Sequence, residues 1–226
     1  MDLIIGVVAR PTEKSYGRFG WKMSDEIKEL IVQNKMLPFL ITGPSKFTEK
    51  LNDQEIIRLE KQLSICDGVI LQGGNNNYPY DKIIVSYLYE NDIPTFGVCL
   101  GMQTMSEVFS VYIKTFERSC INHSQSDKEY FHINRIIPNS KLHKLLNVKE
   151  IKVNSRHHDM VDSTNLFVSA RSTDGIIEAV EDIKKDFFIG VQWHPESMTE
   201  YDKLSRILWK EFFNSARRYH GNKKCD

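Results

Sequence analysis

The sequence has no net charge, because its 30 lysine and arginine residues balance 30 aspartate and glutamate residues. A strongly basic balance would favour nucleic acid or an anionic membrane surface as a partner. Neither partner is therefore expected, and a small-molecule substrate is the simpler prediction.

Long hydrophobic runs are also absent, since no apolar segment reaches the length that spans a bilayer. The apolar segment 3–9 has no basic region before it and leads into Arg10-Pro11, which predicts a first strand rather than a signal peptide. The four cysteines show neither a CxxC pair nor a zinc-ligand spacing, so we expect a reducing, cytoplasmic compartment.

Apolar, β-rich segments alternate with helical patterns in the first half of the chain. The strands expected there are 3–9, 37–42, 68–71 and 93–98. This βαβα order predicts a parallel sheet with ligands at the carboxyl ends of its strands. The second half is richer in strands, many of them expected to be antiparallel: 111–116, 129–137, 149–154, 166–171, 176–181 and 187–193. The length predicts a single α/β domain over residues 1–226, with a last helix over 201–219.

The expected strand 93–98 leads directly into the pattern Gly97-x-Cys99-x-Gly101, which a helical pattern follows. This is the cysteine form of the nucleophile elbow, a sharp strand-to-helix turn that exposes a nucleophile above the sheet. The two glycines suit close backbone packing in such a turn. The positive end of the helix would favour the thiolate of Cys99. A small buried cysteine beside a tight turn fits the same pattern, so the motif alone leaves both interpretations open.

A second motif near the end of the chain reads Gln192-Trp193-His194-Pro195-Glu196. In an extended segment residues two apart point the same way, so His194 and Glu196 could share one side. A cysteine nucleophile needs a base, and that base needs a carboxylate to orient it. The motif alone would also fit a surface turn. Combined with the elbow, it predicts a Cys99–His194–Glu196 triad.

The elbow and the His194 motif together resemble the class I glutamine amidotransferase domain. Segments 71–74, 154–158 and 174–180 further resemble the free-standing γ-glutamyl hydrolases of that superfamily, among them γ-glutamyl-GABA hydrolases. The resemblance covers nearly the whole chain. It implies a flavodoxin-like, open and mostly parallel sheet with helices on both faces and an antiparallel extension. It also implies hydrolysis of a γ-glutamyl amide through a γ-glutamyl thioester, with no cofactor.

The same resemblance implies an oxyanion hole beside the triad. The N–H of Leu100 would pair with the N–H of Gly73 or Gly74, a choice that the sequence leaves open. Such donors stabilise the charge that develops on the carbonyl oxygen. The related hydrolases often carry an aspartate shortly after the glycines, whereas this sequence has Asn75-Asn76-Asn77, which puts their usual recognition of the amino group in doubt.

Substrate-binding residues are also implied by the resemblance rather than by the residues alone. Gln103 would hold the glutamyl end of the substrate. The segment with Asn154, Ser155 and Arg156 would receive the α-amino and carboxylate groups through its backbone.

Selectivity for the leaving group is expected at the mouth of the site. Arg10, Arg18 and Lys22 follow the first strand closely, and Arg156 lies in the substrate segment. Guanidinium groups bind phosphate bidentately, so these residues predict an anionic leaving group. Nearby aromatic side chains could stack on a flat base: Tyr16, Phe19, Trp21, Tyr78 and Tyr80. The overall likeness suggests γ-glutamyl-CDP-amidate, as in capsular phosphoramidate synthesis, although such charges also commonly solvate a surface loop.

Two other functional classes stay open at this point. A glutaminase subunit that passes ammonia to a synthetase partner would carry the same motifs, and a thiol sensor could use the same fold. Segments 154–158 and 174–180 favour the hydrolase, and the sequence leaves a homodimer open. Adjacent histidines on a strand, such as His157 and His158, point to opposite faces, so no metal site is predicted.

Overall fold

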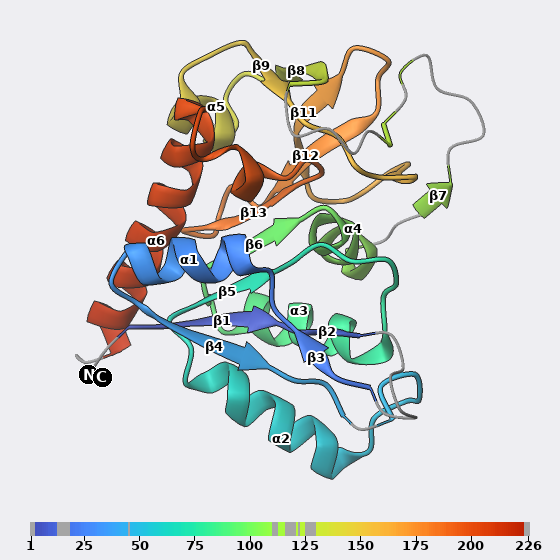
Figure 1. Cartoon of the computed structure of the whole chain (residues 1–226), viewed down its shortest axis with the longest axis vertical. Coiled ribbons are helices and arrows are strands. Elements are labelled where there is room, and N and C mark those ends of the chain that lie inside the picture. Colours follow the sequence, from blue (N-terminus) through green and yellow to red (C-terminus); the bar gives the residue numbers. More distant parts are fainter. Residues whose placement is uncertain are drawn as a thin grey trace.

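The computed structural model describes residues 3–12, 19–44, 46–109, 113–115, 121, 123–124 and 130–223. A twisted open sheet runs through these residues, with helices packed on both faces (Figure 1). Its parallel half has the order β4 (Leu37–Ile41), β1 (Ile4–Val8), β5 (Gly68–Leu71), β6 (Thr95–Val98) and β13 (Phe188–Val191). This is the flavodoxin-like order 2-1-3-4-5, which confirms the fold class expected from the sequence.

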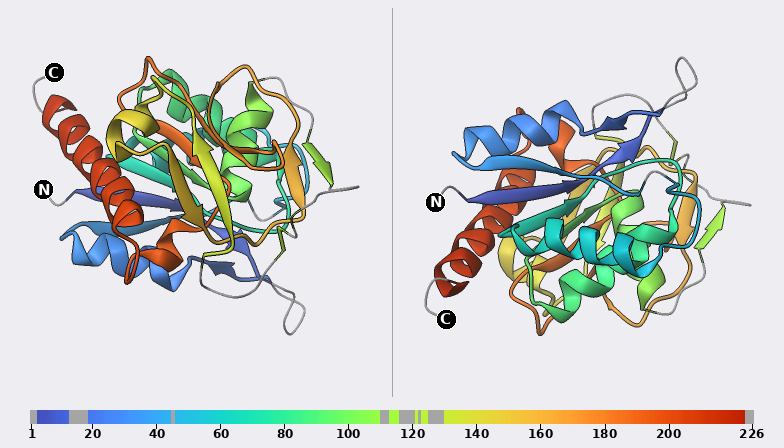
Figure 2. Two further views of the ribbon diagram at one scale, coloured as in Figure 1. Left: turned by 90° about the horizontal axis from the view of Figure 1, so that it is seen from above. Right: turned by 90° about the horizontal axis from the view of Figure 1, so that it is seen from below.

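Two layers of helices cover the parallel strands, which are buried on both faces. On one face lie α1 (Asp25–Gln33) and α6 (Lys203–Lys223), whose Ile31 and Phe212 belong to the same apolar cluster. On the other lie α2 (Asp53–Ser64), α3 (Pro79–Glu90) and α4 (Leu100–Val108). Figure 2 shows the sheet between these two sets of helices. Such double covering explains why these strands read as continuous apolar runs.

The antiparallel extension continues from β13 through β12 (Ile177–Glu181), β11 (Phe167–Ser172), β8 (His132–Ile136) and β9 (Glu150–Val153). Two short strands, β10 (Asp159–Val161) and β7 (Ile113–Thr115), pair at its side. The extension carries the segments 154–158 and 174–180 and brings them beside the end of β13.

Local signals placed several helices correctly. Asn52 and Glu55, a pair that suits a helix start, form a capping box at the start of α2. Ser24 stands at the start of α1, but its side chain makes no capping bond. Tyr201, the first residue of the expected last helix, instead lies before α6 and is 42% exposed. Four features of the described residues were not expected: the hairpin of β2 (Arg10–Pro11) and β3 (Trp21–Lys22), the strand β10, the helix α5 (Lys141–Leu146), and the 3-10 turn η1 (Pro195–Met198).

Within the described residues, no helix is long and apolar enough to cross a membrane.

Candidate active site

Cys99 occupies the turn between β6 and α4, as the elbow motif predicts. Its backbone has φ 52° and ψ −106°, a conformation that side-chain-bearing residues rarely adopt. The Cys99 N–H donates to the Val191 carbonyl at 2.8 Å, which ties the turn to the neighbouring strand β13. The side chain therefore stands at the carboxyl end of the parallel strands, beside the first turn of α4, whose N–H groups have no helical acceptor.

The glycines on either side of Cys99 allow α4 to approach the sheet directly. A Cβ at Gly101 would lie 2.0 Å from the carbonyl oxygen of Leu71, and one at Gly97 would lie 2.5 Å from the Met105 sulfur. Both separations are shorter than any real Cβ contact. The expected reason for the two glycines, close backbone packing in the turn, therefore holds in the structure.

His194 and Glu196 lie next to each other, but the reason differs from the sequence expectation. The strand β13 ends at Val191, and Pro195 begins the 3-10 turn η1 rather than continuing an extended segment. The turn brings the Glu196 carboxylate back to the ring, where His194 Nδ1 lies 2.7 Å from Glu196 Oε1. Because a carboxylate accepts, Nδ1 donates and Nε2 is the nitrogen left for chemistry.

The charged groups around His194 favour its protonated form, the imidazolium. Burial lowers the pKa of this histidine, but the neighbouring Glu196 and Cys99 more than offset burial and raise the pKa to about 10. Gly73 lies against both side chains, since a Cβ there would be 3.0 Å from His194 Cε1 and 3.6 Å from Cys99 Cβ. The structure thus brings Cys99, His194, Glu196 and the Gly73 backbone together at one edge of the sheet.

The loop after β5 is held by side chains from distant parts of the chain. Gln72 Nε2 donates to the carbonyl oxygens of Val8 and Lys22, at 2.8 and 3.0 Å, and the Ser24 N–H donates to its Oε1 at 2.8 Å. The Arg10 side chain packs against Gly74, where a Cβ would lie 3.2 Å from Arg10 Cδ. These contacts hold the loop with Gly73 beside Cys99 and His194 and with Gly74 beside Leu100.

Arg10 does not have the role expected from the sequence. It is 4% exposed, and its Nη1 donates to both carboxylate oxygens of Asp81 at 2.8 Å. Its charge is therefore compensated within the protein, and the prediction that it receives an anionic leaving group is wrong. The pair instead anchors the glycine loop to the start of α3.

Removing one member of this buried pair is expected to destabilise the fold. Arg10→Met leaves the Asp81 carboxylate buried without its counter-charge, which should lower the free energy of unfolding by about 3–5 kcal/mol. Urea denaturation at pH 7 measures the loss. Lys28→Met, which removes a surface ion pair with Asp25, is the matched control and should cost far less. Equal losses in the two variants would contradict a structural role for Arg10.

Gln103 is buried and hydrogen-bonded within the protein rather than open to the site. Its Nε2 donates to the Asp159 carbonyl at 3.1 Å and to Gln192 Oε1 at 3.2 Å. Gln192 Nε2 in turn lies 3.5 Å from Cys99 Sγ. The sequence motif contained Gln192, but no signal in the motif indicated a role for it. The structure makes it the polar side chain that links Cys99 to Gln103.

The side chains of the substrate segment also serve the framework. Asn154 forms two bonds with the His194 backbone, donating to its carbonyl at 2.9 Å and accepting from its N–H at 2.8 Å. Ser155 is buried and donates to the His123 carbonyl at 2.8 Å. Arg156 Nη2 donates to the Ser197 hydroxyl, while its buried Nε has no hydrogen-bond partner among the described residues. Asn154 therefore positions His194, whereas Arg156 keeps donor capacity.

The aromatic side chains expected to stack on a base pack on one another instead. Tyr78 stacks on Tyr80, with ring centroids 5.7 Å apart, and Phe47 makes edge contacts with Tyr78 and Trp21. Tyr80 is fully buried. Lys22 is exposed, and Tyr16 and Arg18 lie outside the described residues.

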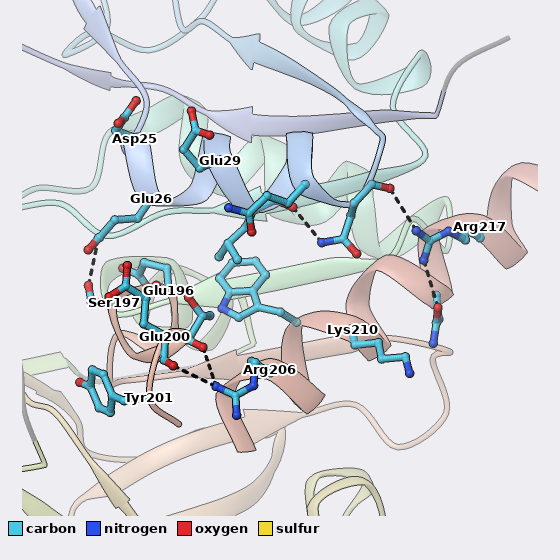
Figure 3. A pocket seen from close by; sticks show the side chains of 16 residues that line it. Asp25, Glu26, Glu29, Glu196, Ser197, Glu200, Tyr201, Arg206, Lys210 and Arg217 are labelled. Carbon is cyan, nitrogen blue, oxygen red and sulfur yellow. Dashed lines mark hydrogen bonds between the residues drawn. The ribbon is translucent and has the colours of Figure 1, made fainter. Parts of the chain in front are cut away.

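A cleft of about 830 Å³ lies between α1, η1 and α6. Glu196 and Ser197 line it, together with charged side chains such as Glu29 and Arg206 (Figure 3). Neither Cys99 nor His194 is among its lining residues. The cleft therefore borders Glu196 but neither of the other two residues of the expected triad.

The fold agrees with the comparisons with known proteins. The Peptidase C26 family model matches residues 79–196, and the chain belongs to this family. The chain is 32% identical to the γ-glutamyl-γ-aminobutyrate hydrolase of Escherichia coli, over 74% of this chain and 78% of that protein. It is 25% identical to a glutamine amidotransferase-like protein of Rickettsia prowazekii, over 87% of this chain and 92% of the relative.

Proteins of nucleotide synthesis are also similar to the chain. It is 26% identical to CTP synthase of Staphylococcus epidermidis over 76% of its length, but spans only 38% of that enzyme. The crystal structure of a GMP synthase subunit protein from Thermoplasma acidophilum superposes with a TM-score of 0.70 at 16% identity, covering 99% of this chain and 98% of its own. That likeness shows the fold.

Proposed function

We propose that the protein hydrolyses a γ-glutamyl amide with Cys99 as nucleophile, His194 as acid and base, and Glu196 as the residue that orients His194. The observation that carries this proposal is the strained Cys99 turn at the strand ends, beside a histidine held by a carboxylate at 2.7 Å. Membership of the Peptidase C26 family supports a hydrolase, and the similarity to γ-glutamyl-γ-aminobutyrate hydrolase supports the glutamyl amide.

In the first half of the reaction, the Cys99 thiolate attacks the δ-carbonyl carbon of the glutamyl group. The carbonyl oxygen becomes an oxyanion, for which the N–H groups of Leu100 and of Gly73 or Gly74 would be the donors. The tetrahedral intermediate collapses as the C–N bond breaks, and His194 Nε2 transfers its proton to the leaving nitrogen. The products are the free amine and a γ-glutamyl thioester on Cys99.

In the second half, water replaces the amine. Neutral His194 takes a proton from water as the oxygen attacks the thioester carbonyl, and the C–S bond then breaks to release glutamate and the thiolate. Glu196 holds the imidazole in the tautomer that presents Nε2 to both steps. All the steps use groups of this chain.

We further propose that the leaving group carries a phosphate, as in γ-glutamyl-CDP-amidate, the substrate that would place the protein in capsular phosphoramidate synthesis. With Arg10 paired to Asp81, Arg156 is the described arginine that supports this proposal. It follows Asn154 and Ser155 in the segment beside His194 and has a buried Nε without a partner in the described structure. A screen of γ-glutamyl amides with phosphate-bearing, acidic and neutral leaving groups tests the substrate directly.

The Arg156→Gln variant should lose the preference for a phosphate-bearing leaving group. A charged hydrogen bond contributes about 1.5–3 kcal/mol, which corresponds to roughly 10- to 150-fold in kcat/KM. The ratio of kcat/KM for the phosphate-bearing amide to that for glutamine measures this effect, because the catalytic steps that the two substrates share cancel in the ratio. Arg171→Gln, which changes an exposed arginine on β11, is the control. Equal losses on both substrates in Arg156→Gln would contradict the assignment.

A glutaminase subunit that delivers ammonia to a synthetase is the second candidate. The similarity to CTP synthase and to the fold of the GMP synthase protein supports it. The two functions differ in uncoupled turnover, because a subunit of this kind is slow until its partner binds. High turnover of γ-glutamyl amides by the isolated protein favours the hydrolase, and slow glutamine hydrolysis that a synthetase stimulates favours the subunit.

A further inference from the structure

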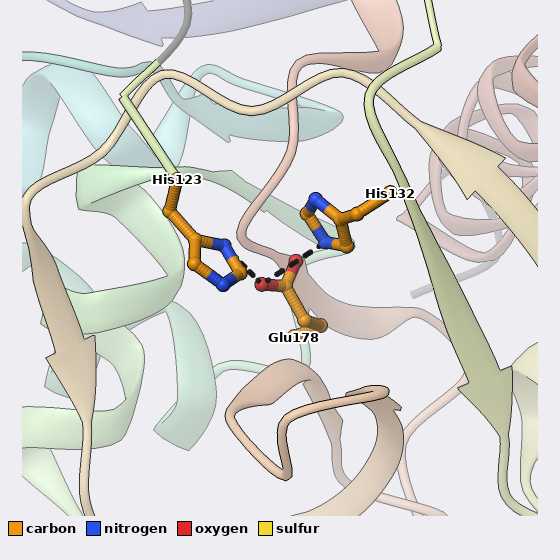
Figure 4. Close-up of side chains that lie close together, drawn as sticks. All are labelled: His123, His132 and Glu178. Carbon is orange, nitrogen blue, oxygen red and sulfur yellow. Dashed lines mark ion pairs between the residues drawn. The ribbon is translucent and has the colours of Figure 1, made fainter. Parts of the chain in front are cut away.

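Three buried histidines surround one buried glutamate behind the active site. Glu178 lies on β12, His132 begins β8, and His123 and His157 come from the segments on either side. From Glu178 Oε1, the distances are 3.4 Å to His123 Nδ1, 3.5 Å to His132 Nε2 and 3.5 Å to His157 Nε2. Figure 4 shows His123 and His132 directed at the Glu178 carboxylate.

Outer partners determine which nitrogens face the glutamate. His157 Nδ1 lies 2.9 Å from the Asp159 carbonyl, and His123 Nε2 lies 3.1 Å from Asp174 Oδ2. Both oxygens only accept, so both nitrogens carry the hydrogen. In the neutral rings, His157 Nε2 and His123 Nδ1 then present lone pairs to Glu178 Oε1. Several acceptors that converge on one point repel one another unless a cation or additional protons lie between them.

Among the described residues, the nearest hydroxyl is engaged elsewhere. The Ser155 hydroxyl lies 3.3 Å from His123 Nδ1, but its hydrogen goes to the His123 carbonyl at 2.8 Å. Both ring nitrogens of His132 and Oε1 of Glu178 are buried without a hydrogen-bond partner in the described part of the chain.

The distances from Glu178 Oε1 to the three histidine nitrogens match the edges of a metal coordination shell. Zinc lies about 2.0–2.2 Å from nitrogen and oxygen ligands, so the edges of a tetrahedral shell measure about 3.3–3.5 Å. The nitrogen-to-oxygen distances above, 3.4 and 3.5 Å, have this length. The ligand atoms of His123, His132 and Glu178 all lie within 4.8 Å of one another.

The surroundings also resemble the outer partners of a metal site. Metal-binding histidines commonly donate their second nitrogen to a carboxylate or a backbone carbonyl, as His123 and His157 do here. The other oxygen of the glutamate accepts from Asn134 Nδ2 at 3.1 Å, which fixes the carboxylate with Oε1 toward the histidines.

We propose that His123, His132 and Glu178 bind a divalent transition metal such as Zn²⁺, with His157 Nε2 as the fourth ligand. The site is closed and structural, because all four side chains are at most 3% exposed. It ties residues 123–124 and segment 154–158 to β12. Since Asn154 holds the His194 backbone, the metal would support the active site without touching substrate.

Metal binding can be tested without an activity assay. Zinc also binds thiolates, so the full chain carrying Cys99→Ala is the parent protein. It is stripped with a chelator, dialysed and titrated with Zn²⁺, with the zinc content and Tm as readouts. We expect one zinc per chain and a Tm rise of about 5–10 °C at 100 times the Kd. No retained zinc and an unchanged Tm would overturn the proposal and leave a cluster held by protons alone.

Variants identify the ligands. His132→Asn and Glu178→Gln, each in the parent, should abolish stoichiometric binding, whereas His143→Asn on α5 should not, because that histidine lies outside the cluster. Unchanged zinc affinity in the His132 variant would contradict the site. If a ligand variant fails to fold, the visible spectrum of Co²⁺ added to the parent protein still tests the metal site. Intense visible bands indicate tetrahedral binding, and the spectrum of free Co²⁺ argues against the site.

Discussion

The Cys99→Ala variant should lose hydrolysis of any γ-glutamyl amide by about 10⁵–10⁶-fold in kcat, as the loss of a nucleophile does in other triads. The physical reason is that, among the described residues, Cys99 is the one thiol beside His194 that could form the thioester. A chromogenic γ-glutamyl anilide would measure the rate. The Tm and the far-UV circular dichroism of the variant should stay close to those of the wild type, because the substitution keeps the backbone of the turn. Retention of more than a few per cent of the rate would contradict the assignment.

Labelling provides an independent test of the same residue. A diazo-ketone analogue of glutamine should modify Cys99, which mass spectrometry of the digested protein would locate. Cys66 is the matched control, since it is fully buried and burial raises its thiol pKa to about 12. Cys120 and Cys225 lie outside the described residues. An adduct mainly on one of these three cysteines would contradict the nucleophile assignment.

Substitutions at the base and at its orienting carboxylate should differ in size. We expect His194→Ala to lower kcat/KM by about 10⁴–10⁶-fold and Glu196→Gln by about 10²–10⁴-fold, because Glu196 orients the base without exchanging the proton. Full activity in Glu196→Gln would contradict the orienting role.

The pH profile separates orientation from simple structural damage. The His194 pKa of about 10 depends on Glu196, the largest of the effects that raise it. In Glu196→Gln the His194 pKa should fall, and the alkaline limb of the rate profile should move to lower pH.

The raised pKa of His194 also makes a contribution to stability that depends on pH. For a histidine whose folded pKa is raised, the stabilisation is fully present below pH 6.5 and is lost as the pH rises toward about 10. Urea unfolding of wild type and His194→Ala at pH 6, 8 and 10 measures this contribution, and the difference should shrink as the pH rises. A constant difference would show that the charge of His194 does not contribute.

Local sequence patterns were sufficient for the parallel half of the fold. The strands at 68–71 and 93–98 and the helix that starts at Asn52 are encoded by neighbouring residues: apolar runs, a capping pair and glycine turns. The elbow could be predicted for the same reason, since its geometry depends on three consecutive elements of sequence, the strand, the glycine-flanked cysteine and the helix.

Side-chain pairing between distant segments could not be predicted in this way. Arg10 is the clearest case, because its partner Asp81 is 71 residues away and nothing near Arg10 indicates a counter-charge. The sequence therefore suggested an arginine available for substrate. In the structure Arg10 is buried, and a buried guanidinium requires a carboxylate partner, which here is Asp81.

The histidine cluster illustrates the same limit. Sequence spacing argued against a metal because only the adjacent pair His157 and His158 was visible, and residues at 123, 132 and 178 show no ligand pattern. Only the antiparallel pairing of β8, β11 and β12 brings His132 beside Glu178. By itself, the sequence determined the nucleophile turn and the family. The tertiary structure decided which charges are compensated and which lone pairs converge, because both depend on contacts between strands that are far apart along the chain.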